Sequence, residues 1–295
     1  MNKIAVYGGL GNQMFQYALN IALNKKGIST KISFSGFLYN HHHNGFNLAK
    51  AFKLKIPFGL KLQQFFILNG GIIYNNKIAA FFFRNIITVL NKYFYKIYTE
   101  KKEFEYDYDI FLQRSTFFVG VWQVEAYFKA IEKDIFEAFT FKVPTDKKNK
   151  SIINAINNCN AVSVHIRRGD YLNENWAAKL VVIKNNTYYN NALKYIVEKV
   201  DNPQFFIFSD DVAWVKENLK IPDGIYVDFN KGQSSYIDMY LMSLCKHNII
   251  ANSSFSWWGA WLNKNSNKIV VMPSKWFNRD YCDGIFPTEW VTIDV

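Results

Sequence analysis

The second half of the chain alternates strand-like and helix-like patterns, and this order constrains the fold more than any other feature. Five short apolar runs indicate strands, at residues 161–166, 204–208, 225–229, 248–251 and 268–272. Helical patterns lie between them, at about 187–200, 211–219, 234–247 and 255–263. Strands that alternate with helices are typical of an open, doubly wound sheet of parallel strands. The sequence therefore predicts an α/β domain over residues 151–295.

The N-terminal part opens with the same kind of pattern. A strand is expected at Ile4–Tyr7, a loop at "GGLGNQ", a helix over 14–26 that Gly27 ends, and a second strand over 28–34. The pattern predicts a second α/β domain over the first 150 residues.

Two tandem domains of this kind would bind a ligand in the cleft between them. The polar stretch "KVPTDKKNKS", residues 142–151, resembles a connection between the domains. Residues 36–110, rich in Phe, Tyr, Asn and Lys, are expected to hold several helices. The last helix or tail of the chain could return to the N-terminal domain.

The net positive charge of the chain comes entirely from its first half. The net charge is +11, and no Asp or Glu precedes Glu100. This bias fits either a solvated lysine-rich face or a surface for anionic phospholipid or an anionic substrate. A non-catalytic basic protein that binds nucleic acid or membrane is one alternative, and it would bind with steep salt dependence. No RNA-binding signature or long basic helix supports nucleic acid as a partner.

Cysteine usage and hydropathy predict a cytoplasmic protein. The three cysteines, Cys159, Cys245 and Cys282, include no CxxC pair and indicate neither a disulfide framework nor a zinc site. The first apolar run is too short for a signal peptide. Residues 79–98 are apolar but contain charged and polar side chains, so a packed or interfacial helix is expected there, not a membrane span. Peripheral contact with the inner membrane face stays open.

Polar clusters follow several strands of the predicted C-terminal sheet. "HIRRGD" follows the first strand, "SDD" the second, Asp228 ends the third, and "ANSSFSWWG" follows the fourth. Ligands of open α/β sheets lie outside the carboxyl ends of the strands. These segments are therefore expected to meet at one binding edge.

The residue types at this edge suit a nucleoside diphosphate. Arg167 or Arg168 can form a paired-donor fork to phosphate oxygens. A loop that leads into a helix can add hydroxyl and backbone N–H donors, from Asn252, Ser253, Ser254 and Ser256. Asp210 or Asp211 could accept from a base such as guanine.

Other interpretations of the same residues stay open. Ser209 or Asp210 can be a helix N-cap, and an arginine can form a structural ion pair with Asp170. The two neighbouring aspartates could also hold Mg²⁺ beside a phosphate.

The N-terminal glycine loop differs from a dinucleotide-binding fingerprint. Gly9 and Gly11 match its first two glycines, but Met14 occupies the third position and the later acidic residue is missing. A nicotinamide or flavin cofactor is therefore not expected. The glycines are expected to let the backbone approach the cleft, where Asn12 and Gln13 offer side-chain amides.

Five segments in order resemble the bacterial α-1,2-fucosyltransferases of glycosyltransferase family 11. They are "GGLGNQMFQYA", "VGVWQVEAYF", "VSVHIRRGDY", "FIFSDD" and "DMYLMSLCKHNIIANSSFSWWGAWL", and they extend over nearly the whole chain. Val124 and Ala126 depart from the family's more usual "WQSEKYF", which makes the role of that segment less secure.

The resemblance implies a GT-B architecture of two Rossmann-like domains, with GDP-fucose on the C-terminal one. It implies transfer of fucose to a galactose 2-hydroxyl with inversion. The acceptor is expected to be an oligosaccharide or a lipid-linked glycan, the latter because the first half of the chain is basic. By position, Arg168 would grip the pyrophosphate, Arg167 would assist, and His165 would orient the site. Fixed positive donors can stabilise the departing diphosphate without a metal, so no metal or other cofactor is expected.

The base for the acceptor hydroxyl is not fixed by the sequence. Glu125 heads the candidates of the N-terminal half and Asp170 is the C-terminal one, although Glu125 could equally be a salt-bridged structural residue. The His41, His42 and His43 triplet is expected in a loop, because consecutive residues point different ways. Another GT-B transferase, with a different donor or linkage, is the nearest alternative function.

Overall fold

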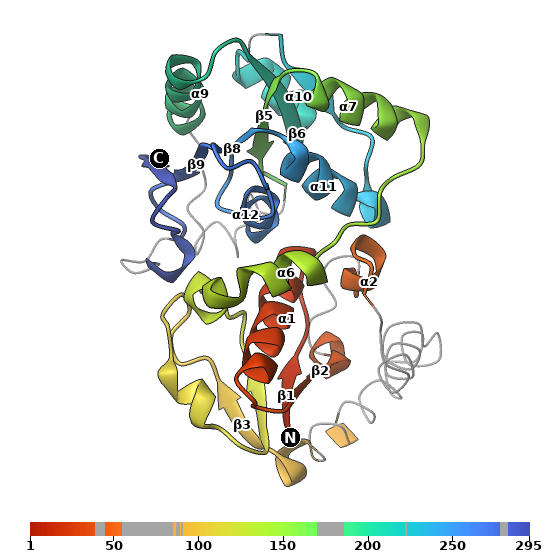
Figure 1. Ribbon diagram of the computed structural model, residues 1–295, viewed down its shortest axis with the longest axis vertical. Helices are drawn as coiled ribbons and strands as arrows, with labels where there is room; N and C mark the ends of the chain where they lie inside the picture. Colours follow the sequence, from red (N-terminus) through yellow and green to blue (C-terminus); the bar gives the residue numbers. More distant parts are fainter. Residues whose placement is uncertain are drawn as a thin grey trace. The chain divides into compact units, whose positions relative to one another are not determined.

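The computed structural model describes residues 1–38, 45–54, 85–86, 89, 91–169, 186–221, 223–277 and 283–295. The chain divides into two compact units (Figure 1). Unit 1 comprises Met1–Lys142 with Asp283–Ile285, and unit 2 comprises Val143–Cys282 with Phe286–Val295. The division follows residue 142, whereas the sequence placed it at residue 150. The predicted connection also contains the first residues of a helix, α7 (Lys147–Asn157), which Asp146 caps by accepting from the Asn149 N–H at 2.9 Å.

Unit 1 is built on a parallel sheet with the order β2-β1-β4-β3 among the described strands. The strands are β1 (Asn2–Ala5), β2 (Thr30–Ser33), β3 (Lys96–Thr99) and β4 (Thr116–Val119). Its helices are α1 (Leu10–Lys25), α2 (Leu48–Ala51) and α6 (Glu132–Ala138). Short 3-10 turns are η1 (Phe34–Leu38), η3 (Tyr108–Leu112), η4 (Glu125–Tyr127), η5 (Lys129–Ile131) and η8 (Asp283–Ile285).

Helix α1 starts earlier than predicted. The sequence placed "GGLGNQ" in a loop, but the helix begins at Leu10, so Gly11, Asn12 and Gln13 belong to its first turns. Leu10 and Met14 are both buried and lie one turn apart, which extends the apolar face of the helix to its N-terminus. Gly27 follows the helix with a φ of 74°, as expected for a glycine that ends it.

Unit 2 contains the larger sheet, with strands in the order β10-β9-β8-β5-β6-β7, all parallel. The strands are β5 (Asn160–Ile166), β6 (Pro203–Ser209), β7 (Ile225–Val227), β8 (His247–Ile249), β9 (Val270–Pro273) and β10 (Val291–Ile293). The helices between them are α9 (Thr187–Lys199), α10 (Val212–Asn218), α11 (Tyr236–Leu244) and α12 (Ser254–Trp261), with a short turn η7 (Gly232–Ser234). This confirms the predicted α/β class and its two Rossmann-like units.

Side chains alternate across β5 and separate the two faces of the sheet. Val162, Val164 and Ile166 pack in a core with residues of α9 and α10. Ser163 and His165 face the other way, where Ser163 accepts from Asn248 and the His165 ring lies 5.8 Å from that of Phe255 on α12. Strand alternation therefore decides which helices each residue that follows β5 can reach.

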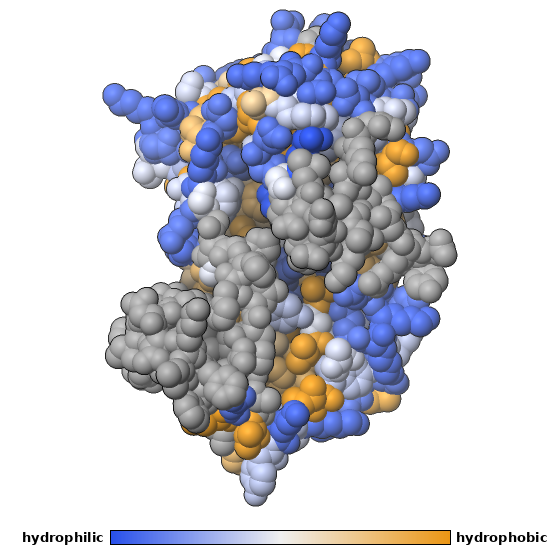
Figure 2. All heavy atoms as spheres, turned by 180° about the vertical axis from the view of Figure 1, so that it is seen from behind, coloured by the Kyte–Doolittle hydropathy of each residue, from blue (hydrophilic) through white to orange (hydrophobic). Residues whose placement is uncertain are grey.

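The described surface differs between the units. Figure 2 shows mainly hydrophilic residues on unit 2 and more apolar ones on unit 1. Large exposed apolar side chains of unit 1 include Ile86, Val89, Tyr93 and Phe94. No helix within the described residues is long and apolar enough to cross a membrane. The predicted contact with an anionic membrane stays a prediction.

Candidate active site

The two arginines of "HIRRGD" lie just beyond the carboxyl end of β5, in different surroundings. Arg167 is 30% exposed in its side chain and its Nη1 lies 3.1 Å from Asp210 Oδ2. Arg168 is only 14% exposed, with its guanidinium carbon 3.6 Å from the ring centre of Trp214 on α10 and its Nε 3.5 Å from Asp211 Oδ2. The structural ion pairs considered from the sequence therefore exist, but with Asp210 and Asp211. The earlier candidate, Asp170, lies outside the described residues.

Asp210 holds the loop that carries the arginines. Its Oδ1 accepts from the Arg168 N–H at 2.9 Å and its Oδ2 from the Gly169 N–H at 3.1 Å. A Cβ at position 169 would lie 2.8 Å from Asp210 Oδ2, so a larger residue would have to displace this carboxylate. Asp210 is thus engaged by the backbone and a guanidinium group, and its predicted contact with a base stays a prediction.

Asp211 caps α10. Its Oδ1 accepts from the Trp214 N–H at 3.1 Å, and the Ser209 Oγ accepts from the Asp211 N–H at 3.0 Å. The sequence considered Ser209 or Asp210 as the cap, but the helix begins one residue later, at Val212. Both carboxylates of this pair face guanidinium groups, which does not suit them to a Mg²⁺ site. The described residues contain no group of three or more His, Cys, Asp or Glu placed to hold a metal.

His165 is a buried, neutral imidazole beside the arginines. Burial and the charge of Arg167 lower its pKa to about 3, so it carries no charge near neutral pH. Its Nδ1 has no hydrogen-bond partner within the described part of the chain. A buried polar atom without a partner is uncommon and fits a place where a ligand binds.

The serine-rich loop leads into α12, as predicted, but its residues differ in availability. Ser253 is the N-cap, accepting from the Phe255 N–H at 3.4 Å. Ser256 is fully buried and its Oγ donates to the carbonyls of Ala251 and Ser253, while Asn252 Nδ2 donates to the Trp276 carbonyl at 3.0 Å. Ser254, partly exposed at the first position of α12, is the hydroxyl best placed for a ligand.

The predicted residues of unit 1 lie at the carboxyl edge of its sheet. Gly9 is the N-cap residue of α1, and Asn12 Oδ1 accepts from Gln123 Nε2 at 2.7 Å. Gln13 is buried and bonds within the unit, to the Gly8 and Gly45 carbonyls and the Asn47 N–H. It therefore braces its own unit, which differs from the predicted contact with a ligand.

Of the two candidates for the general base, Glu125 and Asp170, the structure describes only Glu125. Glu125 begins η4, and its Oε1 lies 3.0 Å from Lys129 Nζ, which matches the salt-bridged structural alternative. The His41–His43 triplet, like Asp170, lies outside the described residues. Neither Trp214 nor Glu100 had a predicted role. An aromatic residue three positions after the "DD" pair was the signal that could have indicated a partner for an arginine.

The stacked ring of Trp214 should set the orientation of Arg168. Replacing Trp214 by leucine is expected to lower kcat/KM roughly 3–30-fold, because a cation–π contact contributes about 0.5–2 kcal/mol. Trp214→Phe keeps a ring and should recover most of the loss. Steady-state kinetics of both variants check this; equal losses would contradict a stacking role.

Comparison with known proteins identifies the family of the chain. A family model described as "Glycosyl transferase family 11" matches residues 1–294. An "Alpha-1,2-colitosyltransferase" of Escherichia coli is 36% identical, covering 97% of each chain. An "O-antigen biosynthesis glycosyltransferase WbnK" of Escherichia coli is 31% identical, covering 97% of this chain and 98% of the relative. A "Galactoside alpha-(1,2)-fucosyltransferase 1" of Ateles belzebuth is 29% identical over 45% of this chain and 38% of its own length.

Among solved structures, the fucosyltransferase NodZ from Bradyrhizobium matches with a TM-score of 0.46 and 15% identity, covering 88% of this chain and 92% of NodZ. The family match extends over both units and includes the arginine loop, the aspartate pair and the serine loop. The resemblance seen in the sequence is therefore confirmed: this chain belongs to glycosyltransferase family 11.

Proposed function

We propose that the protein transfers L-fucose from GDP-fucose to the 2-hydroxyl of a terminal galactose, with inversion, in a surface glycan. The observation that carries this proposal is the pair of arginines beyond β5, fixed by Asp210, Asp211 and Trp214 beside the orphaned Nδ1 of His165. Two relatives have an α-1,2 linkage in their names and support this linkage: the colitosyltransferase, which matches nearly the whole chain, and the galactoside fucosyltransferase, which matches 45% of it. The O-antigen relative supports a surface glycan as the acceptor.

The chemistry of such a transfer requires support for a leaving diphosphate. Negative charge grows on GDP as the bond to the sugar breaks, and fixed guanidinium donors bind it more strongly in the transition state than in the ground state. The side chain of Arg167 is 30% exposed, whereas that of Arg168 is 14% exposed. Arg168 lies against Trp214 on α10. This favours Arg167 for the phosphate contact and Arg168 for support, although the sequence had ranked Arg168 first.

Colitose is the second candidate for the transferred sugar, because one relative that matches 97% of this chain is a colitosyltransferase. Colitose is fucose without its 3-hydroxyl. A site that hydrogen-bonds this hydroxyl rejects the deoxy sugar by roughly 10⁴-fold, whereas an apolar site discriminates by only about 10²-fold. The ratio of kcat/KM for GDP-fucose and GDP-colitose therefore shows whether the donor site hydrogen-bonds the 3-hydroxyl of the sugar or is apolar there.

The test is GDP release with GDP-fucose, GDP-colitose, GDP-mannose and UDP-galactose, with and without N-acetyllactosamine, in buffer and in EDTA. We expect acceptor-dependent release with GDP-fucose, or with GDP-colitose as the second candidate, and the same rate in EDTA. Release with UDP-galactose alone would overturn the guanine-nucleotide donor. Loss of activity in EDTA that Mg²⁺ restores would overturn metal-independent transfer.

A further inference from the structure

Glu100 lies at the carboxyl end of β3, and its carboxylate binds the backbone that leaves the neighbouring strand β4. Its Oε2 accepts from the Val121 N–H at 2.8 Å, and the Trp122 N–H lies 3.1 Å from Oε1 and 3.2 Å from Oε2. Charge-assisted hydrogen bonds of this kind are stronger than neutral ones. One side chain thus fixes the start of the segment "GVWQ", residues 120–123.

The turn that Glu100 holds has an unusual backbone. Trp122 has a φ of 57°, in the left-handed region that residues with large side chains rarely adopt. At Gly120, a Cβ would lie 2.6 Å from the Glu100 Cβ, so any other residue would push the turn away from the carboxylate. Strained backbone of this kind persists only where its surroundings hold it, and it is concentrated at functional sites.

The turn presents Gln123 at the carboxyl edge of the unit 1 sheet. Gln123 is 6% exposed, and its Nε2 donates to Asn12 Oδ1 at 2.7 Å. Its Oε1 is buried without a hydrogen-bond partner in the described chain. The bond to Asn12 fixes the orientation of the amide and leaves the carbonyl oxygen as an acceptor for a hydroxyl group. The carboxyl edge of an open α/β sheet is where ligands bind.

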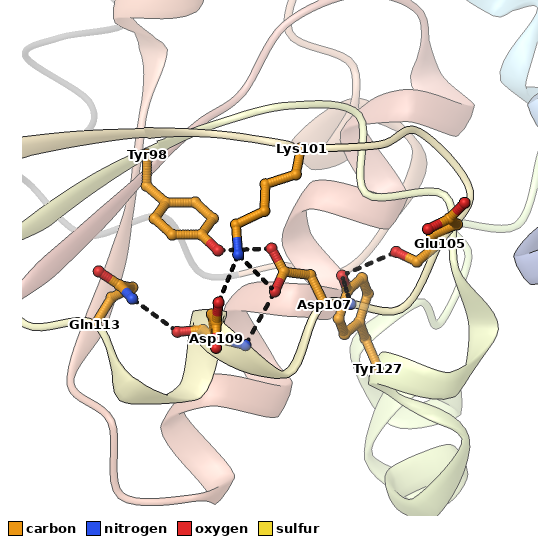
Figure 3. Close-up of polar contacts among 7 residues, drawn as sticks. All are labelled: Tyr98, Lys101, Glu105, Asp107, Asp109, Gln113 and Tyr127. Atoms are coloured by element: carbon orange, nitrogen blue, oxygen red, sulfur yellow. Dashed lines mark hydrogen bonds and ion pairs between the residues drawn. The ribbon is translucent and has the colours of Figure 1, made fainter.

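A polar cluster around Tyr98, Lys101 and Asp107 lies near Glu100 in the sequence, and Figure 3 shows the cluster. Tyr98 Oη donates to Asp107 Oδ2 at 2.6 Å, and Lys101 Nζ lies 2.5 Å from Asp109 Oδ2 and 3.6 Å from Asp107 Oδ1. The Asp107 N–H donates to the Tyr127 hydroxyl at 2.9 Å, which joins the cluster to the segment after the turn. Tyr98 lies two positions before Glu100 and Lys101 one position after it, so the cluster anchors the chain on both sides of Glu100.

The surroundings of Glu100 also set its ionisation. Burial raises its pKa to about 7; the Trp122 and Val121 N–H groups oppose the rise and the charge of Glu103 adds to it. Two tyrosines, Tyr7 and Tyr127, respond to the charge of Glu100. Their pKa values are raised mainly by burial, and the negative charge of Glu100 adds to the rise. Neither tyrosine is charged near pH 7. The carboxylate therefore titrates in the neutral range.

We propose that Glu100 is a positioning residue for acceptor binding: its ionised carboxylate holds the turn so that the Gln123 amide oxygen receives a hydroxyl of the acceptor glycan. This proposal rests on the proposed function in that it needs a hydroxyl-bearing acceptor. Only the ionised form can accept from both N–H groups with both oxygens. Binding of the acceptor should therefore weaken as the pH falls through 7.

The test compares Glu100→Gln with Glu103→Gln, which removes the same charge three positions away. In Glu100→Gln an NH₂ group replaces one accepting oxygen, so we expect the acceptor KM to rise about tenfold or more, with GDP affinity and donor KM unchanged. The fall of kcat/KM for the acceptor below pH 7 should disappear in this variant and persist in Glu103→Gln. Retained GDP affinity and melting temperature exclude simple misfolding.

The variant Gln123→Ala separates positioning from direct catalysis. If Glu100 acts through Gln123, the double variant should have about the same acceptor KM as the worse single variant, because the two effects share one interaction. An unchanged acceptor KM in Glu100→Gln, additive effects in the double variant, or a loss confined to kcat would each overturn the positioning role. A wild type that transfers no sugar from any donor would instead overturn the proposed function and this proposal with it.

Discussion

Replacing Arg167 by lysine is expected to lower kcat by about 10²–10³-fold, the magnitude found when one donor to a developing oxyanion is removed. Lysine keeps the charge but loses the planar fork that binds two phosphate oxygens at once. The side chain of Arg167 is the more exposed of the two, 30% against 14% for Arg168, which makes it the arginine more open to that contact. Steady-state kinetics with saturating acceptor measure the effect.

Two further arginine variants show whether the loss is specific to Arg167. Arg168→Lys should cost only about tenfold, because a lysine at this position keeps its charge beside Asp211 and loses chiefly the stacking on Trp214. Arg114→Lys is the matched control, since the exposed Arg114 only donates to the Phe111 and Gln113 carbonyls of unit 1. An inactive Arg168→Lys with a fully active Arg167→Lys would restore the order that the sequence alone favoured.

Replacing Asp210 by alanine is expected to lower kcat/KM about 100-fold. The change removes the acceptor of two backbone N–H groups and the ion partner of Arg167. Hydrogen bonds to a charged group contribute about 1.5–3 kcal/mol each, and partial exposure places the combined loss near the lower end. The loop that carries both arginines would then lose its fixed position.

The same variant decides between the two roles considered for Asp210. A residue that reads guanine would change the preference for GDP over UDP, whereas a residue that holds the loop weakens both nucleotides alike. Competition binding of GDP and UDP to Asp210→Ala measures this ratio. We expect an unchanged ratio with both affinities lowered; a ratio that falls toward one would contradict the structural role.

The sequence predicted unit 2 in more detail than unit 1, and the reason is physical. Strands buried on both faces read as continuous apolar runs, and the helices between them are amphipathic, so β5 to β9 and α9 to α12 stand out. The short terminal strand β10, Val291–Ile293, is only partly buried and gave no such signal. In unit 1 the strand β3, Lys96–Thr99, overlaps the window 79–98, which was interpreted as a helix; only Tyr98 of the strand is buried, so no apolar run marks it.

The sequence predicted which residues form the candidate site, but not which residues each of them contacts. The pattern identified Arg167, Arg168, Asp210 and Asp211, and sheet topology explains why they meet, since β5 and β6 pair in parallel from Asn160 to Ile166. Which carboxylate caps α10 depends on a shift of one residue that the sequence does not encode visibly. The Glu100 contact depends on a left-handed Trp122, a conformation with no propensity signal.

The measurement that tests the central claim most directly is the linkage of the product. GDP-fucose and N-acetyllactosamine are incubated with the enzyme, and the trisaccharide is analysed by NMR. The account predicts fucose α-linked to the 2-hydroxyl of galactose, and colitose in the same linkage if GDP-colitose is the better donor. Fucose on any other hydroxyl, or free fucose with no trisaccharide, would contradict it.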